Sequence, residues 1–322
     1  MKFTHLVFAA LLVSHAAFAQ DYPNKPVKVV VPWPAGGTTD AAGRIIAQRL
    51  SARMSNPFIV ENRAGATGMI GATAVAQSPA DGYTLLLASA ETQAINPHTY
   101  RKLSYDPAKD FVVIAPFVIN PFTVVVRGDF PATSINGLVD LARANPGKYT
   151  YSSAGLGSAS QLAMEIFKTQ AGVDLLHIPF QGEAPAVTAL MSGQVDAQIL
   201  PAGRAAALSK SGKIKVFAVT TQERFFGMTD VPTLRESGFD KVNIANWFAL
   251  AAPAATPTLV VQRLYSELQA IVQSPDAQSA FRGMGVDVYP AVSQQDFQKF
   301  VASEMIRWGE VIQRSNIKLD QK

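Results

Sequence analysis

The sequence predicts an α/β protein made of two lobes with a ligand cleft between them. Strand and helix patterns alternate along most of the 322 residues, a length that commonly forms more than one domain. Two similar strand, glycine loop and helix units lie far apart in the chain, in VKVVVPWPAGGTTDAAGR and KYTYSSAGLGSASQLAME. Two long extended segments, Val112–Arg127 and Val242–Ala252, are each suited to cross between lobes.

The first nineteen residues have the pattern of a secretory signal peptide. Lys2 precedes an apolar run from Leu6 to Val13, and the stretch ends in Ala17-Phe18-Ala19. The run is shorter than the ~20 residues that a membrane span needs. We therefore expect cleavage after Ala19 and export to a bacterial periplasm, the alternative being a buried N-terminal helix.

The first half of the chain shows strand–helix units. Val27–Val31 is a continuous β-branched run, as expected for a strand buried on both faces. The turn-rich loop Pro32–Thr39 follows, and Asp40–Met54 has the apolar spacing of an amphipathic helix. The next expected elements are a strand at Phe58–Glu61, a helix at Gly68–Gln77 and a strand at Tyr83–Ala88. Such alternation indicates a mainly parallel sheet.

The second half continues the alternation and ends in helices. Strands are predicted at Phe111–Phe117 and Thr123–Arg127, separated by Asn120-Pro121. Further strands are expected at Tyr149–Ser152, Leu175–Phe180, Ala197–Leu200, Lys215–Thr220 and Val242–Ala251. Helices are expected at Leu138–Ala144, Gln161–Ala171, Thr258–Gln273, Pro275–Met284 and Ser293–Ser315.

The composition excludes several kinds of chemistry. The net charge is only +4 and no run of basic residues occurs, so a nucleic-acid partner is not expected. The chain has no cysteine, which rules out thiol catalysis, disulfides, iron–sulfur clusters, Cys-based zinc sites and a lipoprotein anchor. Of four histidines, His5 and His15 lie in the predicted signal peptide. With His98 and His177 alone remaining, we expect neither a metal site nor a cofactor.

The two glycine loops are the strongest candidates for a binding site. A helix N-terminus presents free backbone N–H groups and the positive end of the helix dipole, and glycines let a ligand approach the backbone. Thr38, Thr39, Ser158 and Ser160 add hydroxyl groups. Two such units facing each other would hold a carboxylate. The alternative is that these hydroxyls only cap helices, with Ser158 and Gln161 forming a capping box.

No enzyme motif accompanies these loops. The sequence lacks a complete GxGxxG, a GKS or GKT triplet and a GxSxG elbow. A Ser–His–acid triad would need His98, in an expected loop, or His177, inside the apolar strand LLHIPF. We therefore expect a binding protein, with an exported hydrolase or isomerase as the alternative. Asp40 is either a first-turn helix acid or a ligand contact through water.

Seven segments carry a resemblance to a known family, in collinear order over the whole mature chain. The sequence resembles the Bug receptors, the TctC-type periplasmic solute receptors of tripartite tricarboxylate transporters. The matching segments are VPWPAGGTTDAAGRIIAQRL, VENRAGATGMIGATAVAQSPADGYTLLLAS, NPHTYRKLSYDPAKDF, YSSAGLGSASQLAMEIF, HIPFQGEAPAVTALMSGQVD, VFAVTTQERFFGMTDVPTLRESGF and WFALAAPAATP.

The resemblance implies a two-lobe periplasmic binding protein with type II-like topology and a C-terminal helical return to the first lobe. Residues 20–122 and 247–322 would form lobe 1, and residues 123–246 lobe 2. It implies a small carboxylate ligand and a membrane transporter or sensor as partner. The sequence gives no sign of a dimer interface, so a monomer is the default expectation. The expected ligand-binding residues are Trp33, Pro34, Ala35, Gly36, Gly37, Thr38, Thr39, Asp40, Ser89, Ser153, Ala154, Gly155, Gly157, Ser158, Phe180, Leu200 and Arg204.

Departures from the family pattern bear on the ligand. Leu200 stands where similar receptors often have an acid that pairs with an amino group, Phe180 replaces a Tyr, and Trp33 replaces a Phe. We therefore expect an aromatic or medium-chain mono- or dicarboxylate without an amino group. Glu91 is either a cleft-rim acid or, the favoured alternative, a solvated loop acid. Arg204 either pairs with a second carboxylate or lies on the surface of a helix.

Overall fold

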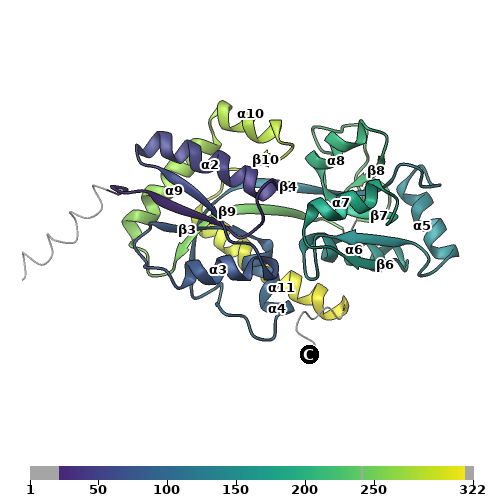
Figure 1. Cartoon of the computed structure of the whole chain (residues 1–322), viewed down its shortest axis with the longest axis horizontal. Coiled ribbons are helices and arrows are strands. Elements are labelled where there is room, and N and C mark those ends of the chain that lie inside the picture. Colours follow the sequence, from purple (N-terminus) through teal and green to yellow (C-terminus); the bar gives the residue numbers. More distant parts are fainter. Residues whose placement is uncertain (1–21, 241, 316–322) are drawn as a thin grey trace, which may run out of the picture.

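The computed structural model describes residues 22–240 and 242–315, which form two lobes joined by long strands (Figure 1). The predicted signal peptide lies outside the described residues. Lobe 1 begins with the parallel strands β1 (Val27–Val31), β2 (Phe58–Asn62) and β3 (Thr84–Ser89). Between them run α2 (Thr38–Met54), the 3₁₀ turn η1 (Ala66–Gly68) and α3 (Met69–Ala76). After β3 come the π-helical turn η2 (Glu91–Ile95) and the short α4 (Asn96–Thr99).

Lobe 2 repeats the strand–helix pattern. Its strands are β5 (Thr150–Ser153), β6 (Leu176–Pro179), β7 (Ala197–Pro201) and β8 (Ile214–Val219). Its helices are α5 (Ile135–Ala144), α6 (Ala159–Ala171), α7 (Glu183–Met191) and α8 (Ala202–Ser209). The chain then returns through β9 (Ala245–Pro253), α9 (Thr258–Val272), α10 (Pro275–Gly283), β10 (Asp287–Val288) and α11 (Gln294–Ser315). Within the described ranges, no helix is both long and apolar enough to cross a membrane.

One strand, β4 (Phe111–Arg127), belongs to both lobes. From Phe111 to Pro121 it pairs with β9, and from Phe122 onward it pairs with β7 and β8. The prediction of two strands interrupted at Asn120-Pro121 is therefore wrong. Proline cannot donate a backbone hydrogen bond, but Pro121 falls where β4 changes partners, so the strand continues through it.

The sheet is mixed rather than mainly parallel. Strands β1, β2 and β3 are parallel, as are β5, β6 and β7. Around the crossing strands the pairing is antiparallel, with β9 between β3 and β4, and with β7 and β8 on β4. The expectation of a mainly parallel sheet is thus wrong for the centre, because β4 and β9 run between lobes in opposite directions.

The core of lobe 1 follows from the composition of β1. Val27, Val29 and Val31 pack with the apolar faces of α2 and α9, whereas Val30 packs on the opposite face of the sheet. All four side chains are buried. The prediction of a strand buried on both faces is confirmed, and burial on this scale contributes ~1.5–3 kcal/mol for each fully buried valine.

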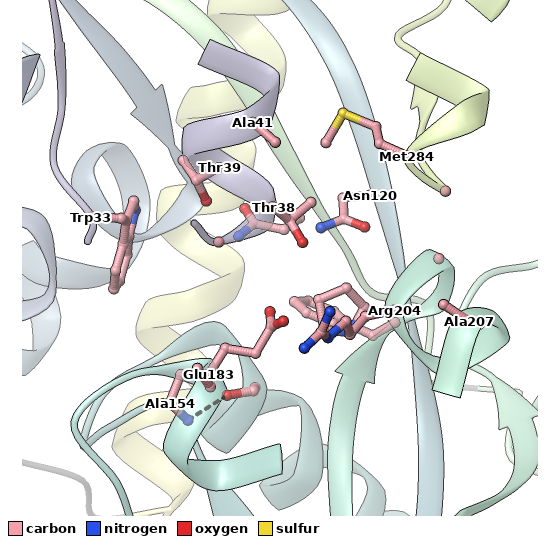
Figure 2. Close-up of a pocket in the computed structure, with 18 of the residues that line it drawn as sticks. Trp33, Thr38, Thr39, Ala41, Asn120, Ala154, Glu183, Arg204, Ala207 and Met284 are labelled. Carbon is pink, nitrogen blue, oxygen red and sulfur yellow. Dashed lines mark hydrogen bonds between the residues drawn. The ribbon is translucent and has the colours of Figure 1, made fainter. Parts of the chain in front are cut away.

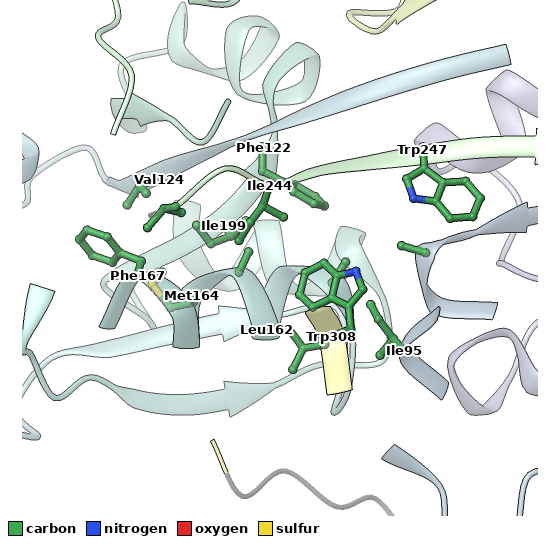
Figure 3. Packing of buried hydrophobic residues seen from close by; sticks show 14 of the residues in the cluster. Ile95, Phe122, Val124, Leu162, Met164, Phe167, Ile199, Ile244, Trp247 and Trp308 are labelled. Carbon is green, nitrogen blue, oxygen red and sulfur yellow. The ribbon is translucent and has the colours of Figure 1, made fainter. Parts of the chain in front are cut away.

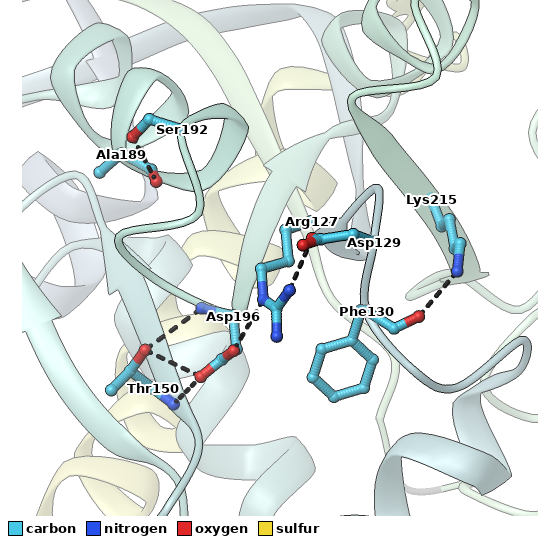
Figure 4. Close-up of polar contacts among 8 residues, drawn as sticks. All are labelled: Arg127, Asp129, Phe130, Thr150, Ala189, Ser192, Asp196 and Lys215. Atoms are coloured by element: carbon cyan, nitrogen blue, oxygen red, sulfur yellow. Dashed lines mark hydrogen bonds and ion pairs between the residues drawn. The ribbon is translucent and has the colours of Figure 1, made fainter.

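Charged groups anchor the end of β4 inside lobe 2 (Figure 4). Arg127 Nε lies 2.9 Å from Asp196 Oδ1, and Arg127 Nη1 lies 2.6 Å from Asp129 Oδ1. Asp196 Oδ2 accepts hydrogen bonds from the backbone N–H of Thr150, at 2.9 Å, and from its hydroxyl, at 3.2 Å. The β4 terminus is therefore held to β5 as well as to its sheet neighbours.

Helix α11 connects the lobes on the side away from α10. It packs against η2 and α4 in lobe 1 and against α6 in lobe 2. Figure 3 shows the indole of its Trp308 beside Ile95 and Leu162, which belong to different lobes. Trp308 is fully buried, and its Nε1–H donates to Glu304 Oε2 at 3.1 Å.

Replacing Trp308 by alanine should destabilise the protein by ~3–5 kcal/mol, because it removes a large buried side chain and leaves a cavity. The matched control is Ile306→Ala on the same helix, where the side chain is 68% exposed and the expected cost is below ~0.5 kcal/mol. Urea unfolding of the three proteins measures both values. Equal costs for the two variants would show that α11 does not join the lobes through Trp308.

Candidate functional site

A cleft of about 900 Å³ lies between the lobes, and both glycine loops open onto it (Figure 2). Lobe 1 contributes the loop between β1 and α2, and lobe 2 contributes the loop between β5 and α6. Ten of the predicted ligand-binding residues line this cleft: Trp33, Pro34, Ala35, Gly36, Gly37, Thr38, Thr39, Ala154, Ser158 and Arg204. The two loops thus meet in space although more than a hundred residues separate them in the sequence.

The N-terminus of α2 points its first turn at the cleft. The N-cap residue is Gly37, and no side chain caps the helix. Thr38 and Thr39 are therefore the first two helical residues, so the alternative that they serve only as caps is wrong. An uncapped helix N-terminus offers free N–H donors and the positive end of the helix dipole. These donors face the cleft, where they suit an anion.

Asp40 holds this loop from behind and does not line the cleft. Its Oδ2 accepts hydrogen bonds from Gly36 N–H and from Arg44 Nε, both at 3.0 Å, and its Oδ1 accepts from Asn62 Nδ2 at 2.9 Å. Burial raises the pKa of Asp40, but the hydrogen bonds from Arg44, Gly36 and Asn62 outweigh it and hold the pKa below its usual value. Asp40 is therefore an ionised acid that positions the glycine loop.

The second loop is both capped and exposed to the cleft. Ser158 is the N-cap of α6, and its Oγ accepts from Gln161 N–H at 3.4 Å, as the capping alternative predicts. The return bond of a capping box is not made, because Gln161 Oε1 accepts from Gly157 N–H and Ser158 N–H donates to the Gly155 carbonyl. The same Oγ donates to the carbonyl of Gly155 at 2.7 Å and lies 3.1 Å from Ser160 Oγ. Ser158 and Ser160 nevertheless line the cleft. Capping and ligand contact are compatible here, because a hydroxyl both donates and accepts.

A directional hydrogen-bond chain fixes the second loop from inside lobe 2. Gln161 Oε1 accepts from Gly157 N–H at 2.6 Å, so its amide nitrogen, 3.2 Å from His177 Nδ1, is the donor there. His177 therefore carries its proton on Nε2 and donates to Ser153 Oγ at 2.7 Å. Ser153 Oγ in turn donates to the Gly155 carbonyl at 3.0 Å. The chain needs a neutral His177, and burial lowers the pKa of this histidine to about 4.

Ser153 and His177 form a serine–histidine contact that resembles a catalytic pair, but neither residue lines the cleft. Tyr151 stacks on the His177 ring, with ring centroids 4.7 Å apart. His98 lies in α4 rather than in the expected loop, close to Gly309 of α11. Among the residues that the structure describes, no group of histidines and acids is arranged to hold a metal ion.

Several other predicted residues also lie outside the cleft lining. Phe180 packs with Leu200 in an apolar cluster of lobe 2, so the expectation that it contacts a ligand does not fit its position. Leu200 points to this cluster because successive residues of β7 alternate between faces. Ser89 is buried and donates to Glu91 Oε2 at 2.7 Å. Gly155 and Gly157 shape the loop through φ values of 136° and 73°.

Two acids line the cleft, contrary to the inference drawn from Leu200. Glu91 is buried and accepts hydrogen bonds from Asn246 Nδ2 at 3.2 Å, so the favoured alternative of a solvated loop acid is wrong. Glu183, in the first turn of α7, points its carboxylate into the cleft near Arg204 (Figure 2). Burial raises the pKa of Glu183, against the opposing effect of Arg204. The sequence offered only one signal for it, an acid directly after Gly182.

One wall of the cleft is cationic, and its floor holds buried polar atoms that lack hydrogen-bond partners among the described residues. Arg204, Lys210 and Arg282 line the wall that α8 and the end of α10 form. On the floor, the side-chain oxygens of Asn120 and Gln198 are buried and accept no hydrogen bond from any described residue. Buried polar atoms are normally paired, so this floor suits a ligand or water that donates hydrogen bonds.

Comparison with known proteins places these features in a family. The model of the tripartite tricarboxylate transporter family receptor matches residues 42–317. Protein BugT of Bordetella pertussis is 32% identical over 94% of this chain and 92% of its own length. R. palustris Rpa4515, solved with adipate, is 36% identical with a TM-score of 0.88, over 92% of this chain and 99% of that chain. MatC from Rhodopseudomonas palustris, solved with malate, is 29% identical with a TM-score of 0.83, over 90% and 100%.

The hydrogen-bond chain through His177 makes stability depend on pH. Between pH 6.5 and about 4 the unfolded chain protonates this histidine whereas the folded protein does not, so stability falls as the pH falls through that range. Replacing His177 with glutamine should remove this part of the pH dependence of the free energy of unfolding. The part removed is at most ~2 kcal/mol, because solvent screens a partly exposed group. Urea unfolding of both proteins at pH 4.5 and pH 7.5 measures it. If the free energy of unfolding of both proteins changes equally between the two pH values, His177 is not the source of this pH dependence.

Proposed function

This chain belongs to the tripartite tricarboxylate transporter family of receptors, and from that premise we propose that it captures a small carboxylate between its lobes. Its class is that of periplasmic solute-binding receptors, a two-lobe fold that it shares with its solved relatives. The proposal adds the ligand class, the residues that bind it, and the movement that retains it.

The observation that carries the proposal is the uncapped N-terminus of α2 facing the capped but accessible N-terminus of α6 across one cleft. The backbone N–H groups of Thr38 and Thr39 and the hydroxyls of Ser158 and Ser160 then form one anion site with contributions from both lobes. Helix N-termini are well suited to carboxylates. The presence of adipate in Rpa4515 and malate in MatC supports this ligand class.

The opposite wall supports a second anchor. We assign Arg204 as the partner of a distal carboxylate, with Lys210 and Arg282 adding positive charge. The cleft lining is also partly aromatic, with Trp33, Phe122, Phe225, Phe226 and Phe248. A cleft of about 900 Å³ is at the upper end of typical ligand sites. A medium-chain or aromatic dicarboxylate fits this arrangement better than a very short acid.

Glu183 and Glu91 favour a second candidate ligand. A carboxylate in the cleft pairs with an ammonium group, so the acids remove the argument against an amino acid that rested on Leu200. We retain the dicarboxylate as the first candidate because burial raises the pKa of Glu183. A protonated Glu183 would donate a hydrogen bond to a ligand carboxylate instead of repelling it.

Binding would proceed by closure of the lobes. A ligand that touches both lobes binds the closed state better and shifts the population toward it. We propose residues 20–122 and 247–322 as lobe 1 and 123–246 as lobe 2, because β4 changes partners at Pro121 and Phe122. The receptor would then deliver its ligand, as a monomer, to a membrane transporter or sensor after export and cleavage following Ala19.

Replacing Arg204 with glutamine should weaken adipate binding roughly 10–100-fold, because a charge-assisted hydrogen bond is worth ~1.5–3 kcal/mol. Hexanoate, which lacks the distal carboxylate, should bind both proteins equally. Arg235→Gln is the control, since that arginine lies on the surface of lobe 2 and pairs with Gln222. Isothermal titration of the three proteins, each beginning at Gln20, measures their affinities for adipate and hexanoate, and the parent is also titrated with glutamate. Stronger binding of glutamate than adipate would favour the amino-acid candidate.

The raised pKa of Glu183 predicts that adipate binds more tightly as the pH falls toward that pKa, because protonation removes a negative charge from the cleft. Glu183→Gln should bind adipate at least as well as the parent at pH 8 and should lack this part of the pH dependence. Titration of the ligand itself is common to both proteins and cancels in the comparison. Identical pH profiles for the two proteins would contradict the role given to Glu183.

A further inference from the structure

The two lobes touch at both rims of the cleft as well as through the crossing strands. At one rim, Thr67 Oγ1 of lobe 1 donates to the carbonyl of Leu156 in lobe 2 at 3.3 Å. At the other rim, the guanidinium of Arg282 lies 5.5 Å from the centre of the Phe226 ring. Beside that pair, Gly203 at the start of α8 meets Gly285 after α10. The lobes of this structure are therefore already in contact around the cleft.

The contact between Gly203 and Gly285 has no room for a side chain. A Cβ atom added to Gly203 would lie 2.3 Å from both the Cα and the carbonyl oxygen of Gly285. A Cβ atom added to Gly285 would lie 2.1 Å from the Cα of Gly203. These neighbours are backbone atoms, which cannot move aside as a flexible side chain does. A methyl group at this point would have to push the two lobes apart.

The two glycines differ in what their own backbone requires. Gly285 has a φ of 80°, a left-handed conformation in which glycine is favoured whatever the contact. Gly203 lies in α8, where alanine forms the helix better than glycine does. Local structure therefore gives no reason for glycine at position 203, and the contact with the other lobe does. A side chain at Gly285 would both disturb the contact between the lobes and strain the local backbone. A side chain at Gly203 would disturb only the contact, so Gly203 is the position to substitute.

We propose that the Gly203–Gly285 contact is the stop at which the lobes close, and that the bare backbone at Gly203 is required to retain the ligand. The inference rests on the proposed function, since it concerns closure of the same cleft. It also bears on selectivity. Because the lobes already meet at this stop and at Thr67, the cleft of about 900 Å³ is close to its closed size. The stop therefore sets the lower limit of the volume that a ligand and its waters must fill.

The test variant is Gly203→Ala. Its methyl group should prop the lobes open, so adipate and malate should bind roughly tenfold or more weakly, because the closed state is less populated. The melting temperature without ligand should stay equal or rise, since alanine favours the helix. The matched control is Gly137→Ala in α5 of lobe 2, where the three atoms nearest to the added methyl belong to Ala132 and Ser134 of the same lobe, at 3.1 Å or more.

Distances between the lobes give an independent readout. The chain has no cysteine, so spin labels attach only at Ala52→Cys in α2 and Gln194→Cys in lobe 2, both exposed positions. In the labelled parent, adipate should increase the population at the shortest distances seen by pulsed electron paramagnetic resonance. Gly203→Ala should lack these shortest distances, with and without ligand, whereas Gly137→Ala should keep them.

The outcomes separate the two proposals. If the parent binds adipate or malate and Gly203→Ala matches it in affinity and distances, the stop is wrong and the proposed function stands. If the parent binds neither acid, the proposed ligand class fails for these probes. The distances without ligand then decide the inference by themselves: loss of the shortest ones in Gly203→Ala supports the stop, and an unchanged distribution overturns it.

Discussion

The continuous strand β4 is the constraint on which the other features of the structure depend. Its first part pairs with β9 in lobe 1 and its last part pairs with β7 and β8 in lobe 2, so a single strand orients both lobes. Asn120 and Phe122, at the change of partners, form part of the cleft floor. Any movement of one lobe against the other must bend β4 and β9 near this point, while α11 and Trp308 follow on the far side. The crossing thus sets the cleft and its floor together, and it is where the proposed closure would bend the chain.

Electrostatics then divides the cleft into two ends. The uncapped first turn of α2 and the hydroxyls at the start of α6 form the first end, where Asp40 fixes the loop that bears the donors. Arg204, Lys210 and Arg282 form the second end. Glu91 is held by Asn246 and Ser89, whereas burial raises the pKa of Glu183. Under the proposed function, a negatively charged ligand meets hydrogen-bond donors at both ends, and protonation of Glu183 removes one negative charge from the cleft.

The features that local patterns determine were predictable from the sequence. The strand Val27–Val31, the helix after the first glycine loop and both loops of the cleft follow from hydrophobic periodicity and turn residues. Features set by tertiary pairing were not. The sequence pattern predicts Phe180 and Leu200 in the cleft, because it does not reveal which face of lobe 2 they occupy. Glu183 and the Gly203–Gly285 contact arise only when α7, α8 and α10 meet across the cleft. The continuity of β4 through Pro121 depends on partners more than seventy residues away.

A crystal structure of the protein from Gln20 onward, refolded from denaturant and then saturated with adipate, tests the central claim most directly. The account predicts closed lobes with one carboxylate at the backbone N–H groups of Thr38 and Thr39 and near Ser158, and the other carboxylate on Arg204. Adipate bound elsewhere, or bound within the cleft without contact to the first turn of α2, would contradict the claim that two helix N-termini form the carboxylate site.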